Sequence, residues 1–333
     1  MGTVEMPAAA DAADAADAAD GAGGLDAGPE GPAPGTWGAY RRRPAAALRP
    51  HIVNYTGFRT RFGAPRRRLE LPTGHVTLVF AFEEGLWVSR AEGGRAAPAP
   101  VRLRPAAGAV VAGPRTGWAI GVHAGAVHGL EVNMTPLGAR RLFGLPMTHL
   151  GPGRAAPDPA ELLGPGGRYL AERLYGLGSW AERFDLLDAV FTARLDRGPA
   201  AAPEVREALA RLWADSGSLA RAAAGTGWSA RTLRARFREQ VGLSPKGVAR
   251  VFRLQHALRL LAAGMPPARV AAACGYHDQA HLGREVKAMT GLSPSRFAVL
   301  RGGLPPGSAL DRLPGRITSV LLPPGEAPGA CRF

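Results

Sequence analysis

The sequence predicts a multidomain protein. A mainly β N-terminal domain (cupin-like, or a small α+β barrel or sandwich) precedes an all-α domain with two helix-turn-helix units joined by a long linker helix. Short apolar runs separated by Gly and Pro fill residues 36–154, and apolar residues at helical spacing follow. The tetrapeptide Gly-Leu-Ser-Pro also occurs twice, at residues 242–245 and 291–294, so one small helical unit is written twice.

Composition divides the chain into four parts. Residues 1–35 carry an Asp-Ala-Ala repeat followed by Gly and Pro, and we expect a disordered tail there. Residues 36–198 form the β-rich effector or dimerisation domain, which ends in helices, and residues 203–302 form the helical domain. Residues 303–333 are a Pro- and Gly-rich tail, which we expect to be mostly irregular around one short apolar run.

Six short apolar runs predict the strands of the N-terminal domain; they cover residues 76–82, 86–88, 101–103, 110–112, 118–122 and 130–134. Helical spacing then predicts a helix at residues 137–145 and one or two more between residues 169 and 195. Residues 198–203 read as the linker to the helical domain.

The positive charge is concentrated in the helical domain. The chain has a formal net charge of +14, and residues 203–303 contribute 16 Lys and Arg against 6 Asp and Glu. A GC-rich coding bias accounts for abundant arginine but not for this distribution. The charge therefore favours a polyanionic partner of the repeated region.

Several classes of protein are not indicated. Cys274 and Cys331 fit no metal spacing and no disulfide framework, which is typical of a reduced, cytoplasmic protein. No secretory leader or membrane-spanning run is predicted. The histidines of the β-rich region show no tight metal-ligand spacing, so we predict no metal site; these histidines are His51, His75, His123, His128 and His149. No Ser/His/Asp or paired-carboxylate arrangement and no phosphate-binding loop stands out, so we predict no cofactor and no enzyme.

The first repeated unit reads as a helix-turn-helix. Helices at residues 205–214 and 219–224 lead to a glycine-containing turn, and Ser229 caps a helix at residues 230–241. One face of that helix is apolar. The opposite face is basic and polar, and the DNA-contact candidates of this helix are Ser229, Arg231, Thr232, Arg234 and Arg238.

The second unit repeats the scheme. A short helix at residues 270–273 and a glycine turn lead to Asp278, which caps a helix at residues 279–290. Its groove-contact candidates are Gln279, His281, Arg284 and Lys287. Each Gly-Leu-Ser-Pro ends one helix and starts another. The helix that begins at the end of the first copy, at residues 245–263, is long enough to link the two units.

Residues 218–297 resemble the DNA-binding domain of the AraC/XylS family of bacterial transcription regulators. The motifs that carry the resemblance are Ser-Ala-Arg-Thr-Leu-Arg-Ala-Arg-Phe from Ser229, Val-Gly-Leu-Ser-Pro-Lys from Val241, Arg-Leu-Gln-His-Ala-Leu-Arg-Leu-Leu from Arg253, and the segment from Ala271 to Lys287 with its trailing Gly-Leu-Ser-Pro. The resemblance implies seven helices and two recognition helices in adjacent major-groove turns of an asymmetric site.

Carried over by position, the resemblance assigns base contacts to both recognition helices. Arg231 and Arg234 would read bases in the first, with Thr232 and Arg238 nearer the backbone, and the second would use Gln279, His281 and Arg284. On the linker helix, Lys246 and Arg250 would contact phosphates. Three positions depart from the family pattern, namely Ala235, Gly283 and Val286, so we expect the second helix to be the weaker reader.

The N-terminal domain carries a fainter resemblance. Residues 71–80, 110–116 and 142–146 are similar to sensor-like domains of uncharacterised role that precede this DNA-binding domain in many actinobacterial regulators. We therefore expect a cytoplasmic, sequence-specific DNA-binding transcription regulator that acts as an activator. Its expected partners are double-stranded promoter DNA, RNA polymerase, an unidentified small-molecule effector and a second copy of the chain. A DNA-modifying repair protein and a non-specific architectural binder remain the alternatives.

Overall fold

The computed structural model describes residues 38–83, 86–92, 95–96, 101–102, 109–151, 162–164, 166–196, 198–215, 227–302, 304, 311–324 and 326. Two expectations lie outside these residues: the tail at residues 1–35 and the short helix at residues 219–224.

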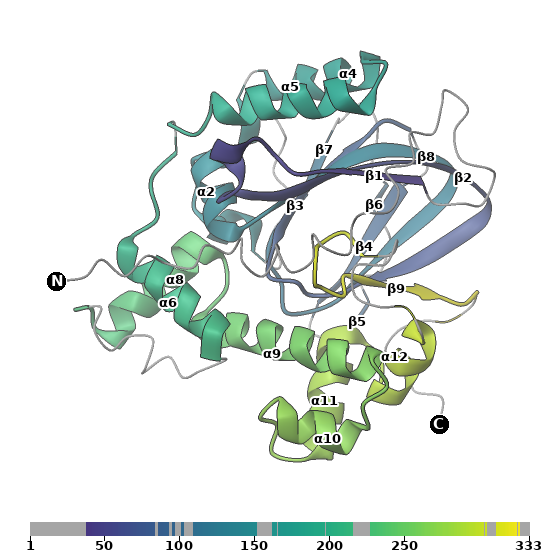
Figure 1. Cartoon of the computed structure of the whole chain (residues 1–333), viewed down its shortest axis with the longest axis vertical. Helices are drawn as coiled ribbons and strands as arrows, with labels where there is room; N and C mark the ends of the chain where they lie inside the picture. The colour runs from purple at the N-terminus through teal and green to yellow at the C-terminus, as the bar shows by residue number, and fades with distance from the viewer. Residues whose placement is uncertain are drawn as a thin grey trace.

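The N-terminal domain is built on one antiparallel sheet (Figure 1). Its strands along the chain are β1 (Gly38–Arg42), β2 (Ile52–Glu70), β3 (Val76–Ala81), β4 (Leu86–Glu92), β5 (Arg95–Ala96), β6 (Val101–Arg102), β7 (Ala109–Ala112) and β8 (Ala119–Met134). The main order is β1-β2-β8-β3-β7; β4 also pairs with β8, and β5 and β6 pair with β4.

Two long strands, β2 and β8, form the middle of the sheet. They pair from Ile52 opposite Met134 to Glu70 opposite Ala119, with register shifts near Ile52 and between Phe62 and Arg66. Such irregularities bend a strand pair and increase its twist. Because of this bend, the second half of β8 pairs with β3 and its first half with β4.

The strand predictions were correct in part. The runs at residues 118–122 and 130–134, predicted as separate strands, are the two ends of the single strand β8. The sequence reading found neither β1 nor β2. The alternation of buried Phe58, Thr60 and Phe62 with exposed arginines was a strand signal, but the Gly-Ala-Pro that follows reads as a turn.

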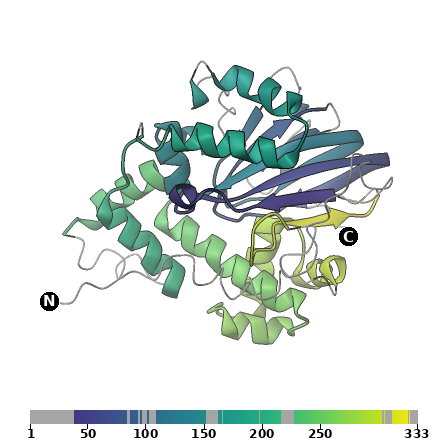
Figure 2. The same ribbon diagram turned by 45° about the horizontal axis from the view of Figure 1, so that its top comes forward.

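Helices cover one face of the sheet (Figure 2). They are α2 (Pro136–Phe143), α4 (Gly167–Gly176) and α5 (Trp180–Thr192), with short 3-10 turns η1 (Ala46–Leu48) and η3 (Met147–Leu150). Leu78, Leu130 and Val132 of the sheet share one buried cluster with Leu174 of α4 and Leu187 of α5. The helices predicted after the strands are therefore confirmed as a layer on the sheet.

The helical domain follows along one side of the sheet domain. Its helices are α6 (Pro203–Asp215), α8 (Ala230–Val241), α9 (Pro245–Ala262), α10 (Pro267–Ala273), α11 (Gln279–Thr290) and α12 (Pro294–Arg301). One core joins these helices to the sheet, because Leu69, Leu71 and Trp118 lie in the same buried cluster as Phe237 of α8 and Leu254 of α9. The two domains thus share apolar surface.

The chain returns to the sheet after the helical domain. Residues 319–322, within the run expected in an irregular tail, form β9 (Ser319–Leu322), which pairs antiparallel with residues 67–70 of β2. This strand was not predicted, because three apolar residues in a segment rich in Pro and Gly do not reveal a partner about 250 positions away. The predicted fold class, a β-rich domain before an all-α helix-turn-helix domain, is confirmed.

Candidate nucleic-acid interface

The first recognition helix, α8, begins and ends as its sequence predicts. The Ser229 hydroxyl accepts a hydrogen bond from the Thr232 backbone N–H at 3.1 Å, and Gly242 ends the helix in the left-handed conformation with φ 84°. A side-chain cap satisfies a backbone N–H that has no partner inside the helix. Leu233, Phe237 and Val241 are buried, so the remaining faces of α8 are the ones that meet solvent.

The solvent-facing side of α8 is cationic. Arg231, Arg234 and Arg238 are exposed, and among the described residues none of them pairs with an acid. Arg236 is different, since it lies 3.1 Å from Glu239 on the same helix. The Thr232 hydroxyl lies 2.8 Å from the Ser229 hydroxyl, which ties it to the cap. This face offers three free guanidinium groups to an anionic partner.

The second recognition helix, α11, repeats this construction with a stronger cap. The Asp278 carboxylate accepts a hydrogen bond from the His281 backbone N–H at 2.6 Å, and Gly291 ends the helix with φ 75°. That backbone hydrogen bond, together with one from the His277 side chain, lowers the pKa of Asp278. A charged cap at a helix N-terminus is also favoured by the helix dipole.

The outer side of α11 carries a mixed set of groups. Gln279, Arg284 and Lys287 are exposed, while His281 is half-buried with its ring edge-on to Tyr276 at 5.4 Å. The His281 Nδ1 accepts a hydrogen bond from the His277 backbone N–H at 3.3 Å. A neutral imidazole that accepts at Nδ1 carries its proton on Nε2, so His281 presents a hydrogen-bond donor.

An ion pair fixes α11 to the linker helix. Arg250 of α9 donates two hydrogen bonds to the Glu285 carboxylate, from Nε at 2.9 Å and from Nη2 at 3.0 Å. Burial raises the pKa of Glu285, but the hydrogen bond and the charge of Arg250 outweigh it and hold that pKa below its usual value. Sequence reasoning assigned Arg250 to phosphates, and that role stays a prediction, whereas Lys246 is exposed at the start of α9.

The linker helix separates the two recognition helices. Figure 1 shows α8 beside one end of α9, and α10 and α11 beside the other. The 18 residues of α9 span about 27 Å at 1.5 Å per residue. The residues predicted to contact bases therefore form two sets on two helices, and not one cluster.

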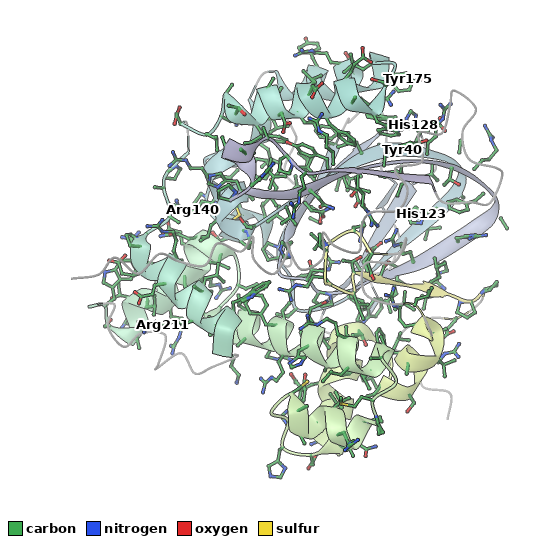
Figure 3. All side chains as sticks on the ribbon, viewed as in Figure 1. Tyr40, His123, His128, Arg140, Tyr175 and Arg211 are labelled. Carbon is green, nitrogen blue, oxygen red and sulfur yellow. The ribbon has the colours of Figure 1, made fainter. Side chains whose placement is uncertain are left out.

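The first recognition helix is docked on the N-terminal domain. Arg140 of α2, labelled in Figure 3, lies 3.7 Å from Glu239 of α8. Gly242 is so close to η3 that an added Cβ would lie 3.1 Å from the Met147 carbonyl oxygen. The Gln240 side chain accepts a hydrogen bond from the Ala202 backbone N–H at 2.9 Å. None of these contacts had a local sequence signal.

Aromatic residues gather between α4 and the sheet. Figure 3 shows Tyr175 of α4 above His128 and Tyr40 of the sheet. Tyr40 stacks on Trp180 at 4.9 Å, and Arg183 lies over the Trp180 ring at 4.7 Å. Burial lowers the pKa of His128 to about 4, with further lowering by Arg183 and Arg59. Arg183 already occupies the aromatic surface, so this cluster holds the outer helices on the sheet.

The described residues contain neither a group of metal-ligating side chains nor an exposed thiol. Among those residues, no three His, Cys, Asp or Glu side chains are grouped so as to hold a metal ion. Cys274 is buried in the turn before α11, and burial raises the pKa of its thiol. A buried thiol of raised pKa is a packing group. No described helix is long and apolar enough to cross a lipid bilayer.

One family model agrees with this geometry. A family model described as a helix-turn-helix domain matches residues 222–298. No curated protein matches the chain. The C-terminal domain of AraT, a response regulator from Geobacillus stearothermophilus, is 23% identical, with a TM-score of 0.30, over 31% of this chain and 90% of its own.

Two further solved structures are similar. A probable AraC family transcriptional regulator from Rhodopseudomonas palustris CGA009 is 28% identical, with a TM-score of 0.28, over 30% of this chain and 99% of its own. ToxT from Vibrio cholerae is 8% identical, with a TM-score of 0.41, over 74% of this chain and 97% of its own.

Proposed function

We propose that this protein is a DNA-binding transcription regulator of the AraC-family type, and that it places α8 and α11 in adjacent major-groove turns of one asymmetric promoter site. The match of residues 222–298 to a helix-turn-helix domain supports the proposal. The observation that carries the proposal is the pair of capped, basic helices at opposite ends of α9. The length of α9, about 27 Å, is of the same order as one turn of B-DNA, about 34 Å.

The two helices read different bases in this proposal. Arg231 and Arg234 of α8 suit guanine, because a guanidinium matches the two acceptors on the major-groove edge of that base. Gln279 of α11 suits adenine, and the His281 Nε2–H can donate to an acceptor on guanine or thymine. Arg238, Lys246 and Lys287 contact phosphates, which fix register without specifying sequence.

The N-terminal domain modulates binding in this proposal. Its contacts with α8, through Arg140 and Met147, give a change in that domain a direct route to the first recognition helix. A small effector or a second copy of the chain would supply that change. The protein would act in the cytoplasm and contact RNA polymerase at the promoter.

Paired substitutions test the reading of DNA. Binding-site selection from random duplexes would first identify the preferred site, and Arg234→Ala and Arg284→Ala would then be compared on it. We expect each to cost about 1 to 3 kcal/mol and to relax preference at one base pair, the two positions lying about one helical turn apart. Arg173→Ala, an exposed arginine on α4, is the matched control and should leave affinity unchanged.

A non-specific architectural binder would give a different result. Such a protein would bind the selected site and random duplex equally, with a steep dependence on salt for both. That outcome would overturn the proposal. A specific reader keeps a large affinity ratio between the two duplexes at each salt concentration.

A further inference from the structure

The face of the sheet turned away from α4 and α5 carries a buried polar patch. Asn54 of β2 lies directly opposite Asn133 of β8, and Thr56 lies opposite Glu131. Alternate residues of a strand point to one face, so these four side chains share it. Glu70, further along β2, is buried on the same face, and only 1% of Asn133 is exposed. Polar groups buried this deeply require partners.

The C-terminal segment covers this patch. Arg312 places its Nη1 2.7 Å from Glu131, and its Nη2 contacts Glu70. Its backbone carbonyl accepts a hydrogen bond from the Asn54 side chain at 2.7 Å. In Figure 1 the segment leading to β9 passes in front of the sheet, between the strands and α9. One guanidinium therefore joins two buried carboxylates of different strands.

Arg312 does not use all the bonding capacity of the patch. Four buried atoms of the patch have no hydrogen-bond partner among the described residues, namely Asn54 Oδ1, Glu70 Oε2, Glu131 Oε2 and Asn133 Nδ2, and of these Glu70 Oε2 is in ion-pair contact with Arg312. Each such atom costs about 1 to 3 kcal/mol if it is left unpaired away from water. Glu131 contacts the Arg312 guanidinium, Asn54 donates to the Arg312 backbone carbonyl, and Asn133 lies opposite Asn54 on the neighbouring strand. A ligand that replaces Arg312 would therefore find further hydrogen-bond partners at the patch.

Glu131 depends on Arg312 for its ion pair. Burial raises the pKa of Glu131 to about 7, although Arg68 and Arg41 act to lower it. Arg68 is already engaged, since it donates a hydrogen bond to Ser319 at 2.7 Å and lies 3.5 Å from Glu70. Without Arg312, Glu131 would keep no ion-pair partner within 4 Å among the described residues.

We propose that Glu70 and Glu131, with the side-chain amides of Asn54 and Asn133, form a binding site for a small molecule bearing a guanidinium group, and that the chain's own Arg312 occupies this site in the present structure. A guanidinium suits the site because its planar fork of donors matches carboxylates of fixed position. The proposal deepens the proposed function, since it names the class of effector through which the N-terminal domain acts.

The segment that carries Arg312 also holds the helical domain. Asp311 pairs with Arg301 of α12 at 2.7 Å, and both side chains are fully buried. Gln255 of α9 donates to the carbonyl oxygens of Pro72 and Ile317, at 2.8 and 3.0 Å, and accepts from the Ile317 N–H at 3.1 Å. A ligand that displaces Arg312 thus loosens the segment that ties α9 and α12 to the sheet.

Removal of the internal competitor tests the proposal without DNA. Methylguanidinium, with methylammonium as the matched control, would be titrated against the full chain and Arg312→Ala, with thermal unfolding and calorimetry as readouts. An intramolecular group competes at millimolar effective concentration. We therefore expect Arg312→Ala to bind methylguanidinium at least about tenfold more tightly than the wild type does, with a matching rise in Tm.

A second variant decides whether the carboxylate is the site. Glu131→Gln in the Arg312→Ala background keeps the shape and removes the charge, and it should lose that binding at least about tenfold. Equal binding by the single and double variants, or equal binding of methylammonium, would overturn the proposal. If Arg312→Ala alone is unfolded, methylguanidinium should restore the folded chain, and failure to restore it also overturns the proposal.

The wild-type chain offers a separate readout. Agmatine, which carries a guanidinium on a flexible amine, should accelerate hydrogen exchange of residues 311–322, and putrescine at the same concentration should not. Unchanged exchange at saturating agmatine contradicts competition with Arg312. Because none of these measurements contains DNA, they can fail while the reading of promoter DNA stands, and the reverse is equally possible.

Discussion

The two helix-turn-helix units are built alike but are held differently. Each recognition helix has a side-chain cap, a buried apolar face and a terminal glycine in the left-handed conformation. The first helix, α8, also packs on α2 and η3 of the N-terminal domain. The second, α11, lies beyond α9 from the sheet (Figure 1), where Arg250 anchors it to the linker helix. The N-terminal domain can therefore act on α8 directly and on α11 through α9.

The largest expected effect is a loss of stability when a buried side chain is truncated in the core of either unit. Phe237 and Val286 are equivalent in the repeat, and both are fully buried. We expect Phe237→Ala to lower the free energy of unfolding by about 3 to 5 kcal/mol, and Val286→Ala by about 2 kcal/mol, because fewer buried carbons are lost. Urea unfolding measures both values, and exposed Ala235→Ser is the control. Equal losses would contradict the expectation that the larger buried side chain, Phe237, stabilises the first unit more than Val286 stabilises the second.

The terminal glycines form a matched pair. Gly242→Ala and Gly291→Ala each force a non-glycine residue into the left-handed region, at a cost of about 1 to 2 kcal/mol. Only Gly242 is buried against η3, where an added Cβ would crowd Met147. Gly242→Ala should therefore be the more destabilising and should also speed hydrogen exchange in η3. A larger effect of Gly291→Ala would show that α8 is not docked.

The ion pair that anchors α11 should have a smaller, pH-dependent effect. Glu285→Gln should cost about 1 kcal/mol or less, since the pair is partly exposed. The folded pKa of Glu285 is lowered, so its contribution is present above the unfolded pKa, about 4.3, and is lost as pH falls through the folded pKa. Unfolding at pH 7 and below pH 4 measures this, with exposed Glu172→Gln as the control. A loss that does not shrink in acid would exclude the pair as its cause.

The smallest expected effect is a stabilisation. Gly283 lies in the middle of α11, and an added Cβ would meet nothing within 4 Å. Gly283→Ala should stabilise the helix by about 0.5 to 1 kcal/mol, because alanine loses less backbone entropy. Thermal unfolding measures the gain. Any fall in stability would mean that α11 needs a glycine for a reason outside its own helix.

Capping residues and terminal glycines explain why both ends of each recognition helix could be predicted from the sequence. Ser229 and Asp278 mark their starts, and Gly242 and Gly291 mark their ends. Long-range pairs leave no such pattern. Arg250 lies 35 residues from Glu285, and Arg312 lies 181 residues from Glu131, so neither pair could be found in a window of sequence. A different limit hid β2, since its buried phenylalanines alternate with arginines before a Gly-Ala-Pro sequence that reads as a turn but lies within the strand.

The return of β9 to β2 has a consequence for how the chain is assembled. The helical domain is, in topology, an insertion between two strands of one sheet. During synthesis the sheet lacks its last strand until every helix of the helical domain has been made, and long-range strand pairing is slow. A fragment that stops near residue 200 would expose the edge of β2 at residues 67–70 and uncover Leu69, which favours aggregation. We therefore expect removal of residues 311–322 to impair folding of the β-rich domain.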